Sequence, residues 1–408
     1  MAQLSPQVTR NWPPVTTLRK GPALRAWPNP LPPPGLLAPD GSPRSFPVAA
    51  IDVAETSTMG SIPEQREVLE FFAIGPPIGS VPVGGIPAGS VVVHRQDSAG
   101  VWSTYGPLPQ GASTLPPGVR LNVSATRTVE GDRISATTVG THTYLCLVGY
   151  DGHLSLAERR GQPTVDGDGV PLGELMKWIS PGLNSTYIWT DLSAGLAAPG
   201  TPYVDVACAA QTDPTTGADQ LHLLAAAQDG RVWHGTASRA LADPTAANYT
   251  PFVPVTALPA GVSRIAAATA DNQLHVVALT GGGGGASAGT WYTIRAGSGA
   301  WQAPEDVGGL IGGLTGYMDV AVGFCDDGVS APAPHPARQL NVALLSSGGR
   351  VDMTVRTAWT QGWGANGTPS QWAHLTQWGG TLTIAMGPLV QPARPFRAIS
   401  LGERPFRP

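Results

Sequence analysis

The chain is poor in charged residues, in cysteine and in long apolar runs. Only 13% of its 408 residues are charged, about half of the roughly 25% that is usual in globular proteins. The cysteines, Cys146, Cys208 and Cys325, are widely spaced and form no C-x-x-C pair, so we expect small buried side chains in a reduced chain. No uninterrupted run of about 18 apolar residues occurs, so no membrane-spanning helix is predicted.

The sequence also lacks the common signatures of catalytic and metal sites. Its eight histidines are scattered, and none has H-E-x-x-H or H-x-H spacing. No Walker loop occurs, and five consecutive glycines at 281–285 are expected to form a loop tip. We therefore expect no metal, no cofactor and no enzymatic activity. Nucleic-acid binding is not expected either, because no basic stripe with interleaved aromatics is present.

Both ends of the chain are basic and differ in composition from the rest. Residues 1–47 hold twelve prolines and a net charge of +4, and 394–408 repeat Arg-Pro-Phe-Arg with a net charge of +3. Because the whole chain carries −4, residues 48–393 carry −11. We expect 1–47 and 394–408 to be extended arms that dock on the acidic body or on a neighbouring chain. The arm residues predicted to do so are Arg10, Arg19, Arg25, Arg394, Arg397, Arg404 and Arg407.

Between the arms, a short apolar element with a central polar residue recurs. Its clearest copies are centred on Asp52, Asp205 and Asp319, with weaker copies at Arg133, Arg264 and Thr383. The spacings between these six positions are 81, 72, 59, 55 and 64 residues. Repeats of this length indicate six copies of one supersecondary unit.

Each unit reads as four short strands. A second apolar block follows the first, at 68–72, 144–148, 221–225, 274–278 and 340–344. Three of these blocks run into Asp151-Gly152, Asp229-Gly230 or Gly348-Gly349, which predict type I′ hairpin turns to a third strand. An aromatic residue then opens the fourth strand, and we expect the tryptophans at 102, 189, 301 and 372 to pack between units.

Four-stranded antiparallel units in this number predict an all-β fold, a β-propeller of about six blades. The sixth unit is short, so we expect a strand from the N-terminal region, around 23–27, to complete it. Five blades with an accessory strand, or seven with a further blade opening at 121–127, are the alternatives.

Two segments resemble a known family. Residues 219–234, with a strand, an Asp-Gly turn and Trp233-His234, and residues 299–308, with Gly299-x-Trp301, are similar to the repeats of tectonin-like and Photorhabdus-type lectin propellers. The resemblance is strongest over 203–310 and absent from the arms. It implies a non-catalytic propeller that binds glycans or other surfaces.

Aromatic side chains are the best candidates for such binding, because tryptophan offers a large rigid apolar face and one N–H donor. We predict exposed, ligand-binding rings at Trp233, His234, Trp359, Trp363 and Trp378.

Three functions are compatible with these features. The arms favour a structural or decoration subunit of a large assembly, such as a phage particle, an injection apparatus or a surface layer, that contacts other protein subunits and also surface glycans. The alternatives are a free glycan-binding lectin and a propeller glycoside hydrolase, which would need acids with shifted pKa values clustered at one axial face. The sequence opens without the basic and apolar regions of a secretory signal. Synthesis in the cytoplasm followed by assembly into a particle is the expected course.

Overall fold

The computed structural model describes part of the chain. The described residues are 23–26, 48–57, 64–74, 91–96, 102–107, 133–139, 142–149, 152–165, 171–178, 189–192, 201–212, 219–238, 250–270, 272–281, 288–311, 316–326, 338–346, 350–357, 363, 373–377, 383–386 and 398–402. The segment 121–127, which would open a seventh blade, and most of both arms lie outside them.

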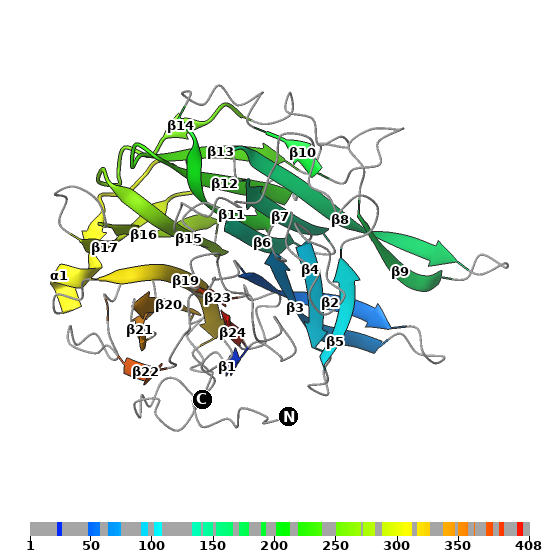
Figure 1. Ribbon diagram of the computed structural model, residues 1–408. Coiled ribbons are helices and arrows are strands. Elements are labelled where there is room, and N and C mark those ends of the chain that lie inside the picture. The colour runs from blue at the N-terminus through cyan, green and yellow to red at the C-terminus, as the bar shows by residue number, and fades with distance from the viewer. Residues whose placement is uncertain are drawn as a thin grey trace, which may run out of the picture.

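The described residues form six sheets, in agreement with the predicted all-β fold (Figure 1). Sheet 1 contains β2 (Val48–Ser57), β3 (Glu64–Ile74), β4 (Val91–Gln96) and β5 (Trp102–Pro107). Sheet 2 contains β6 (Arg133–Val139), β7 (His142–Val148), β8 (Leu154–Val165), β9 (Pro171–Trp178) and β10 (Trp189–Asp191). Sheet 3 contains β11 (Tyr203–Thr212), β12 (Asp219–Ala227), β13 (Val232–Ser238) and β14 (Val253–Pro254).

The remaining sheets continue this order along the chain. Sheet 4 contains β15 (Val262–Ala270), β16 (Gln273–Thr280), β17 (Gly289–Arg295) and β18 (Glu305–Asp306), followed by the short helix α1 (Val307–Ile311). Sheet 5 contains β19 (Tyr317–Asp326), β20 (Arg338–Ser346), β21 (Arg350–Thr357) and β22 (Ala373–Gln377). Sheet 6 contains β23 (Thr383–Met386), β24 (Ala398–Gly402) and β1 (Ala23–Ala26).

Within sheets 1 to 5, strands that follow one another in the chain pair in antiparallel fashion. Sheet 2 is the exception, because β9 and β10 both pair with β8, β9 with its C-terminal half. The six predicted repeat positions all fall in the first strand of a sheet, namely β2, β6, β11, β15, β19 and β23. These first strands contact one another in that order, and β23 also contacts β2. Figure 1 shows them innermost, with the later strands of each sheet farther out.

Sheet 6 joins the two ends of the chain. β1 pairs with β24 in parallel, with Ala23 opposite Ala398 and Arg25 opposite Ser400, and β24 pairs with β23 in antiparallel fashion. As predicted, a strand from the N-terminal region, Ala23–Ala26, joins the sheet at the sixth repeat position; in the described part of the chain this sheet has three strands rather than the predicted four. Arg10, Arg19, Arg394, Arg397, Arg404 and Arg407 lie outside the described residues.

The Asp229-Gly230 turn differs from the predicted type I′ geometry. Gly230 has a φ of 80°, but Asn272 is the only non-glycine residue with a positive φ in the described part of the chain. The amide of Ala227 donates to the carbonyl of Arg231 at 2.8 Å, and the amide of Gly230 donates to Ala227 at 2.9 Å. Such a loop needs one left-handed residue rather than two, which is why aspartate fits beside glycine.

Apolar side chains fill the space between consecutive sheets. One buried cluster lies between sheets 2 and 3, a second between sheets 3 and 4, and a third between sheets 4 and 5. Cys146 and Cys208 are free and buried in the first of them, as predicted, and burial raises the pKa of Cys146. Each described sheet from 2 to 5 is thus covered on a face by its neighbour.

Candidate functional site

The aromatic residues predicted to be exposed are buried where the structure describes them. Trp233 is 9% exposed, His234 3% and Trp363 4%, so the expectation of exposed rings was wrong for all three. Neighbouring sheets cover both faces of sheet 3, so both alternate positions along β13 point into packed interfaces: Trp233 packs with sheet 2, whereas the His234 ring meets Trp301 of sheet 4. Trp359 and Trp378 lie outside the described residues.

The His234 side chain belongs to a polar chain between sheets 3 and 4. Gln211 Nε2 donates to Asn272 Oδ1 at 3.2 Å and lies 3.5 Å from His222 Nε2. His222 Nδ1 lies 3.1 Å from His234 Nε2, and the two rings stack at 5.4 Å between centroids. Because an amide nitrogen only donates, His222 Nε2 accepts, and His222 Nδ1 donates to His234. Both imidazoles are therefore neutral in this arrangement.

An arginine and a tryptophan of sheet 4 face this histidine pair. Arg295 ends β17 and forms a β-bridge with Trp301, and both side chains are half-buried. The Trp301 ring meets the His234 ring edge to face at 5.5 Å. Gly299, at a φ of 94°, closes the loop between them, and a Cβ at this position would lie 3.2 Å from Arg295 Nη2. We call Arg295, Trp301, His222 and His234 the Arg295 site.

The same arrangement recurs between sheets 4 and 5. Arg356 forms a β-bridge with Trp363, and its guanidinium lies 4.9 Å from the centre of the Tyr292 ring. Glu305 accepts hydrogen bonds from Arg356 Nη2 at 3.2 Å and from Trp363 Nε1 at 2.7 Å. The Tyr292 hydroxyl lies 2.7 Å from Nδ1 of His275. We call Arg356, Trp363, Glu305, Tyr292 and His275 the Arg356 site.

Strand register shows that the two sites are equivalent. Ala225 opposes Trp233, Ala278 opposes Trp291 and Leu344 opposes Asp352. Trp233, Trp291 and Asp352 are therefore equivalent positions of the third strands. The residues four positions after them, Ala237, Arg295 and Arg356, are equivalent as well. In sheet 2 the same position holds Arg159, which is buried and donates to Thr143 Oγ1 at 3.0 Å.

The two sites differ in the fourth strand of the preceding sheet. Tyr292 opposes Glu305 in sheet 4, whereas the equivalent His234 opposes Val253 in sheet 3. Glu305 is therefore replaced at the Arg295 site by Val253, whose side chain is 52% exposed. The Glu305 side chain is 35% exposed, and that of Arg356 is 8% exposed.

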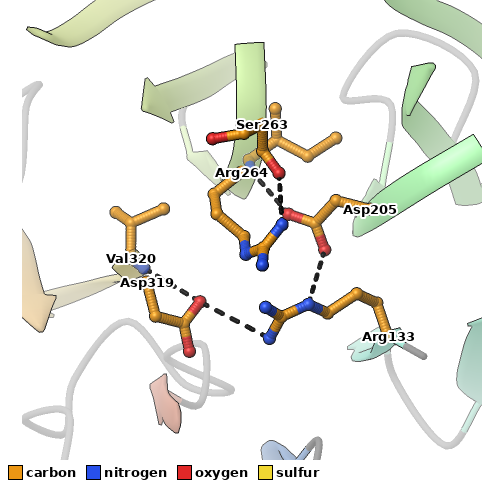
Figure 2. A network of polar contacts seen from close by, with 7 residues as sticks. Arg133, Asp205, Ser263, Arg264, Asp319 and Val320 are labelled. Atoms are coloured by element: carbon orange, nitrogen blue, oxygen red, sulfur yellow. Dashed lines mark hydrogen bonds and ion pairs between the residues drawn. The ribbon is translucent and has the colours of Figure 1, made fainter. Parts of the chain in front are cut away.

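A second group of charged residues lies on the first strands (Figure 2). Arg133 Nε is 3.8 Å from Asp205 Oδ1, and Arg133 Nη1 is 4.0 Å from Asp319 Oδ1. Asp205 Oδ2 accepts the amide of Ile265 at 2.7 Å, and Arg264 extends from β15 toward the same carboxylate. Burial raises the pKa of Asp205 to about 6 even though both arginines lower it. These four charged residues form the axial network.

β-Bulges in the first strands direct the side chains of the axial network toward one another. Register shifts occur at the residues just before Asp205, Arg264 and Asp319, in β11, β15 and β19. A bulge bends a strand and redirects the following side chain. The sequence repeat had placed these positions together, but it did not indicate that arginine and aspartate alternate as partners across the sheets.

We expect the free energy of unfolding to fall on acidification. Burial lowers the pKa of His222 and His275 to about 3 and that of His234 to about 2, whereas the unfolded side chains titrate near 6.5. These histidines favour unfolding as pH falls below 6.5. Asp205 acts in the opposite sense, since its contribution is fully present below 3.8 and is lost as pH rises through 6. Near pH 5 the unfolded state should bind about two more protons than the folded state. The free energy of unfolding should then fall by about 2.7 kcal/mol for each pH unit of acidification.

Denaturant unfolding between pH 4.5 and 6 measures this slope. His275→Gln should reduce it by about one proton, or about 1.4 kcal/mol per pH unit. An unchanged slope in this variant would show that His275 is not buried as a neutral imidazole.

Sequence reasoning missed Arg295, Arg356, Glu305 and Tyr292. A signal was available, since aligning the third strands places Arg295 and Arg356 at one position, each followed by a tryptophan six or seven residues later. Glu305 gave no such signal because its counterpart is Val253.

Other site types are not seen among the described residues. No group of three or more potential metal-ligating side chains occurs there, and no helix there is long and apolar enough to cross a membrane. Gly285, Ser287 and Gly289 have the spacing of a nucleophile elbow, which joins a strand to a helix. Residues 282–287 lie outside the described residues, and the strands on either side of them, β16 and β17, pair with each other in antiparallel fashion.

No family model and no curated protein matches the chain. Among solved structures, SapL1 lectin in complex with alpha methyl fucoside is 15% identical, with a TM-score of 0.43 over 85% of this chain and 86% of that chain. A fungal lectin from Aleuria aurantia, a six-bladed β-propeller that recognises fucose, is 14% identical, with a TM-score of 0.39 over 80% and 81%. Trypanosoma rangeli sialidase in complex with sialic acid is 11% identical, with a TM-score of 0.44 over 86% and 52%. All three TM-scores are below 0.5, so the similarity is distant, and membership of the tectonin-like or Photorhabdus-type lectins stays a prediction.

Proposed function

We propose that this protein is a saccharide-binding, six-bladed β-propeller in which β1 completes the sixth blade. Its binding sites lie between neighbouring sheets, at the Arg295 and Arg356 sites. The observation that carries the proposal is a backbone β-bridge between an arginine and a tryptophan that occurs twice, at equivalent positions of sheets 4 and 5.

The residues at the Arg356 site suit the chemistry of a sugar. A saccharide presents vicinal hydroxyls, which both donate and accept hydrogen bonds, together with an apolar C–H face. Arg356 supplies fixed donors, and Glu305, with a side chain 35% exposed, supplies acceptors. Trp363 and Tyr292 are buried beneath these groups, with ring centroids 5.1 Å apart. The Trp363 indole donates to Glu305 and the Tyr292 ring lies under the Arg356 guanidinium, so the two rings hold the polar pair in place.

Binding without catalysis fits the position of the acids. A glycoside hydrolase needs two carboxyl groups that a substrate can reach. In the axial network the side chains of Asp205 and Asp319 are 7% and 9% exposed, and both lie beside Arg133. We therefore propose that the protein binds saccharides and does not cleave them.

The role of an assembly subunit finds no support in the described residues. Its main argument was that the basic arms contact neighbouring chains. The described strands of the two arms, β1 and β24, instead pair with each other within one chain.

Arg356→Gln tests the proposal. Because a hydrogen bond from a charged group is worth about 1.5–3 kcal/mol, we expect affinity for a saccharide bound at this site to fall about 10- to 100-fold. A glycan array followed by titration calorimetry on the best ligand measures the change.

Arg231→Gln is the matched control. Arg231 is 54% exposed and pairs with Asp229 at the surface, so its replacement should leave binding unchanged. If the wild type retains no saccharide, or if both variants bind as it does, the proposal is wrong.

A further inference from the structure

Arg295 has no carboxylate counter-ion in the part of the chain that the structure describes. No carboxylate among the described residues lies within ion-pair distance of Arg295, and burial alone lowers the pKa of this guanidinium. Arg356, by contrast, is neutralised by Glu305 at 3.2 Å. Two equivalent arginines thus differ in having or lacking a counter-ion.

The missing counter-ion has a local cause in the sequence. The fourth strand of sheet 4 is Glu305–Asp306, and that of sheet 3 is Val253–Pro254. Val253 opposes His234 as Glu305 opposes Tyr292. An exposed valine therefore stands where the neighbouring interface has the acid that binds its arginine.

The groups beneath Arg295 add no negative charge. His222 and His234 are buried, and burial keeps both neutral at physiological pH. Trp301 opposes Arg295 in a backbone β-bridge, its ring lies edge to face on His234, and its side chain is half-buried. The site thus offers a forked cation, an indole and an apolar valine, and none of its described residues is a carboxylate.

We propose that the Arg295 site binds a negatively charged saccharide, whereas the Arg356 site binds a neutral one; this inference rests on the proposed function. A carboxylate or a sulfate on the sugar takes the position that Glu305 occupies at the Arg356 site. Arg295 then donates charge-assisted hydrogen bonds, which are about twice as strong as neutral ones.

The experiment compares an oligogalacturonate with its fully methyl-esterified form, which keeps the sugar ring and removes the charge. Galactose 6-sulfate against galactose forms the sulfate arm, and it distinguishes the two anionic groups. We expect the full-length wild type to bind at least one acidic ligand about tenfold or more tightly than its neutral match, with affinity falling as salt rises.

Substitutions locate this preference. Arg295→Gln should abolish it, and Val253→Glu should also abolish it by supplying an internal partner for Arg295. Val253→Gln is the matched control, since it has the same size without the charge and should keep the preference. Glu305→Gln should raise acid binding, because it removes the carboxylate that pairs with Arg356. Thermal unfolding of each variant verifies that it is folded.

The outcomes separate this inference from the proposed function. If neutral saccharides bind through Arg356 and acidic forms are not preferred, the inference is wrong and the proposed function stands. A preference for acidic ligands that survives both Arg295→Gln and Val253→Glu also overturns it. If no saccharide of either charge binds the wild type, the proposed function fails first.

Discussion

Gly230→Ala is expected to lower the free energy of unfolding by about 3 kcal/mol. Gly230 has a φ of 80°, where an L side chain costs roughly 1–2 kcal/mol. A Cβ there would also lie 2.5 Å from the amide nitrogen of Gly261, in the segment that enters sheet 4. Overpacking of this kind costs about 1–3 kcal/mol. The Asp229-Gly230 turn of sheet 3 therefore packs directly against Gly261, at the start of sheet 4.

A hydrogen bond fixes the same contact. The carbonyl of Gly230 accepts the amide of Val262 at 3.0 Å, and that of Gly152 likewise accepts the amide of Tyr203 at 3.0 Å. Each of these turns thereby holds the first strand of the following sheet.

Gly316→Ala separates the backbone strain of the Gly230 substitution from the cost of its overpacking against Gly261. Gly316 has a φ of 84°, but a Cβ at this position would meet nothing within 4 Å. Its replacement should cost only the backbone strain, about 1–2 kcal/mol. Denaturant unfolding compares the two variants, and equal losses would mean that Gly230 does not pack against Gly261.

Asp205→Ala is expected to cost about 4 kcal/mol of unfolding free energy. The substitution leaves Arg133 buried without its nearer carboxylate and removes the acceptor of the Ile265 amide. Breaking a buried ion pair by removing one partner typically costs about 3–5 kcal/mol. Asp205→Asn keeps an acceptor for the amide and should cost less.

Asp229→Ala provides the surface comparison for Asp205→Ala. Asp229 pairs with Arg231, but the arginine is 54% exposed, so the loss should stay below about 1 kcal/mol. Chemical unfolding of both variants measures the difference. A loss at Asp205 as small as that at Asp229 would contradict a buried axial network.

The repeat pattern was sufficient to place the first strand of each sheet, but not the additional strand β9 of sheet 2. Positions such as Asp205 and Asp319 mark first strands because small apolar residues surround them, and Asp229-Gly230 marks a turn because only glycine takes the left-handed conformation there. Even the short sixth unit indicated that a strand near Ala23 would be needed.

Burial could not be predicted in the same way. Alternation along a strand normally separates a buried face from an exposed one. In sheet 3 both faces are covered, so Trp233 and His234 are both buried although they alternate. Glu305 lies 51 residues before Arg356 and 58 residues before Trp363 in the sequence, and no local pattern links Glu305 to these two partners.

A crystal structure of the protein with a bound saccharide tests the central claim most directly. The account predicts the sugar between sheets 4 and 5, hydrogen-bonded to Arg356 and Glu305, or between sheets 3 and 4 at Arg295. A saccharide bound instead at Asp205 and Asp319 of the axial network, or on the outer strands away from both arginines, would contradict it.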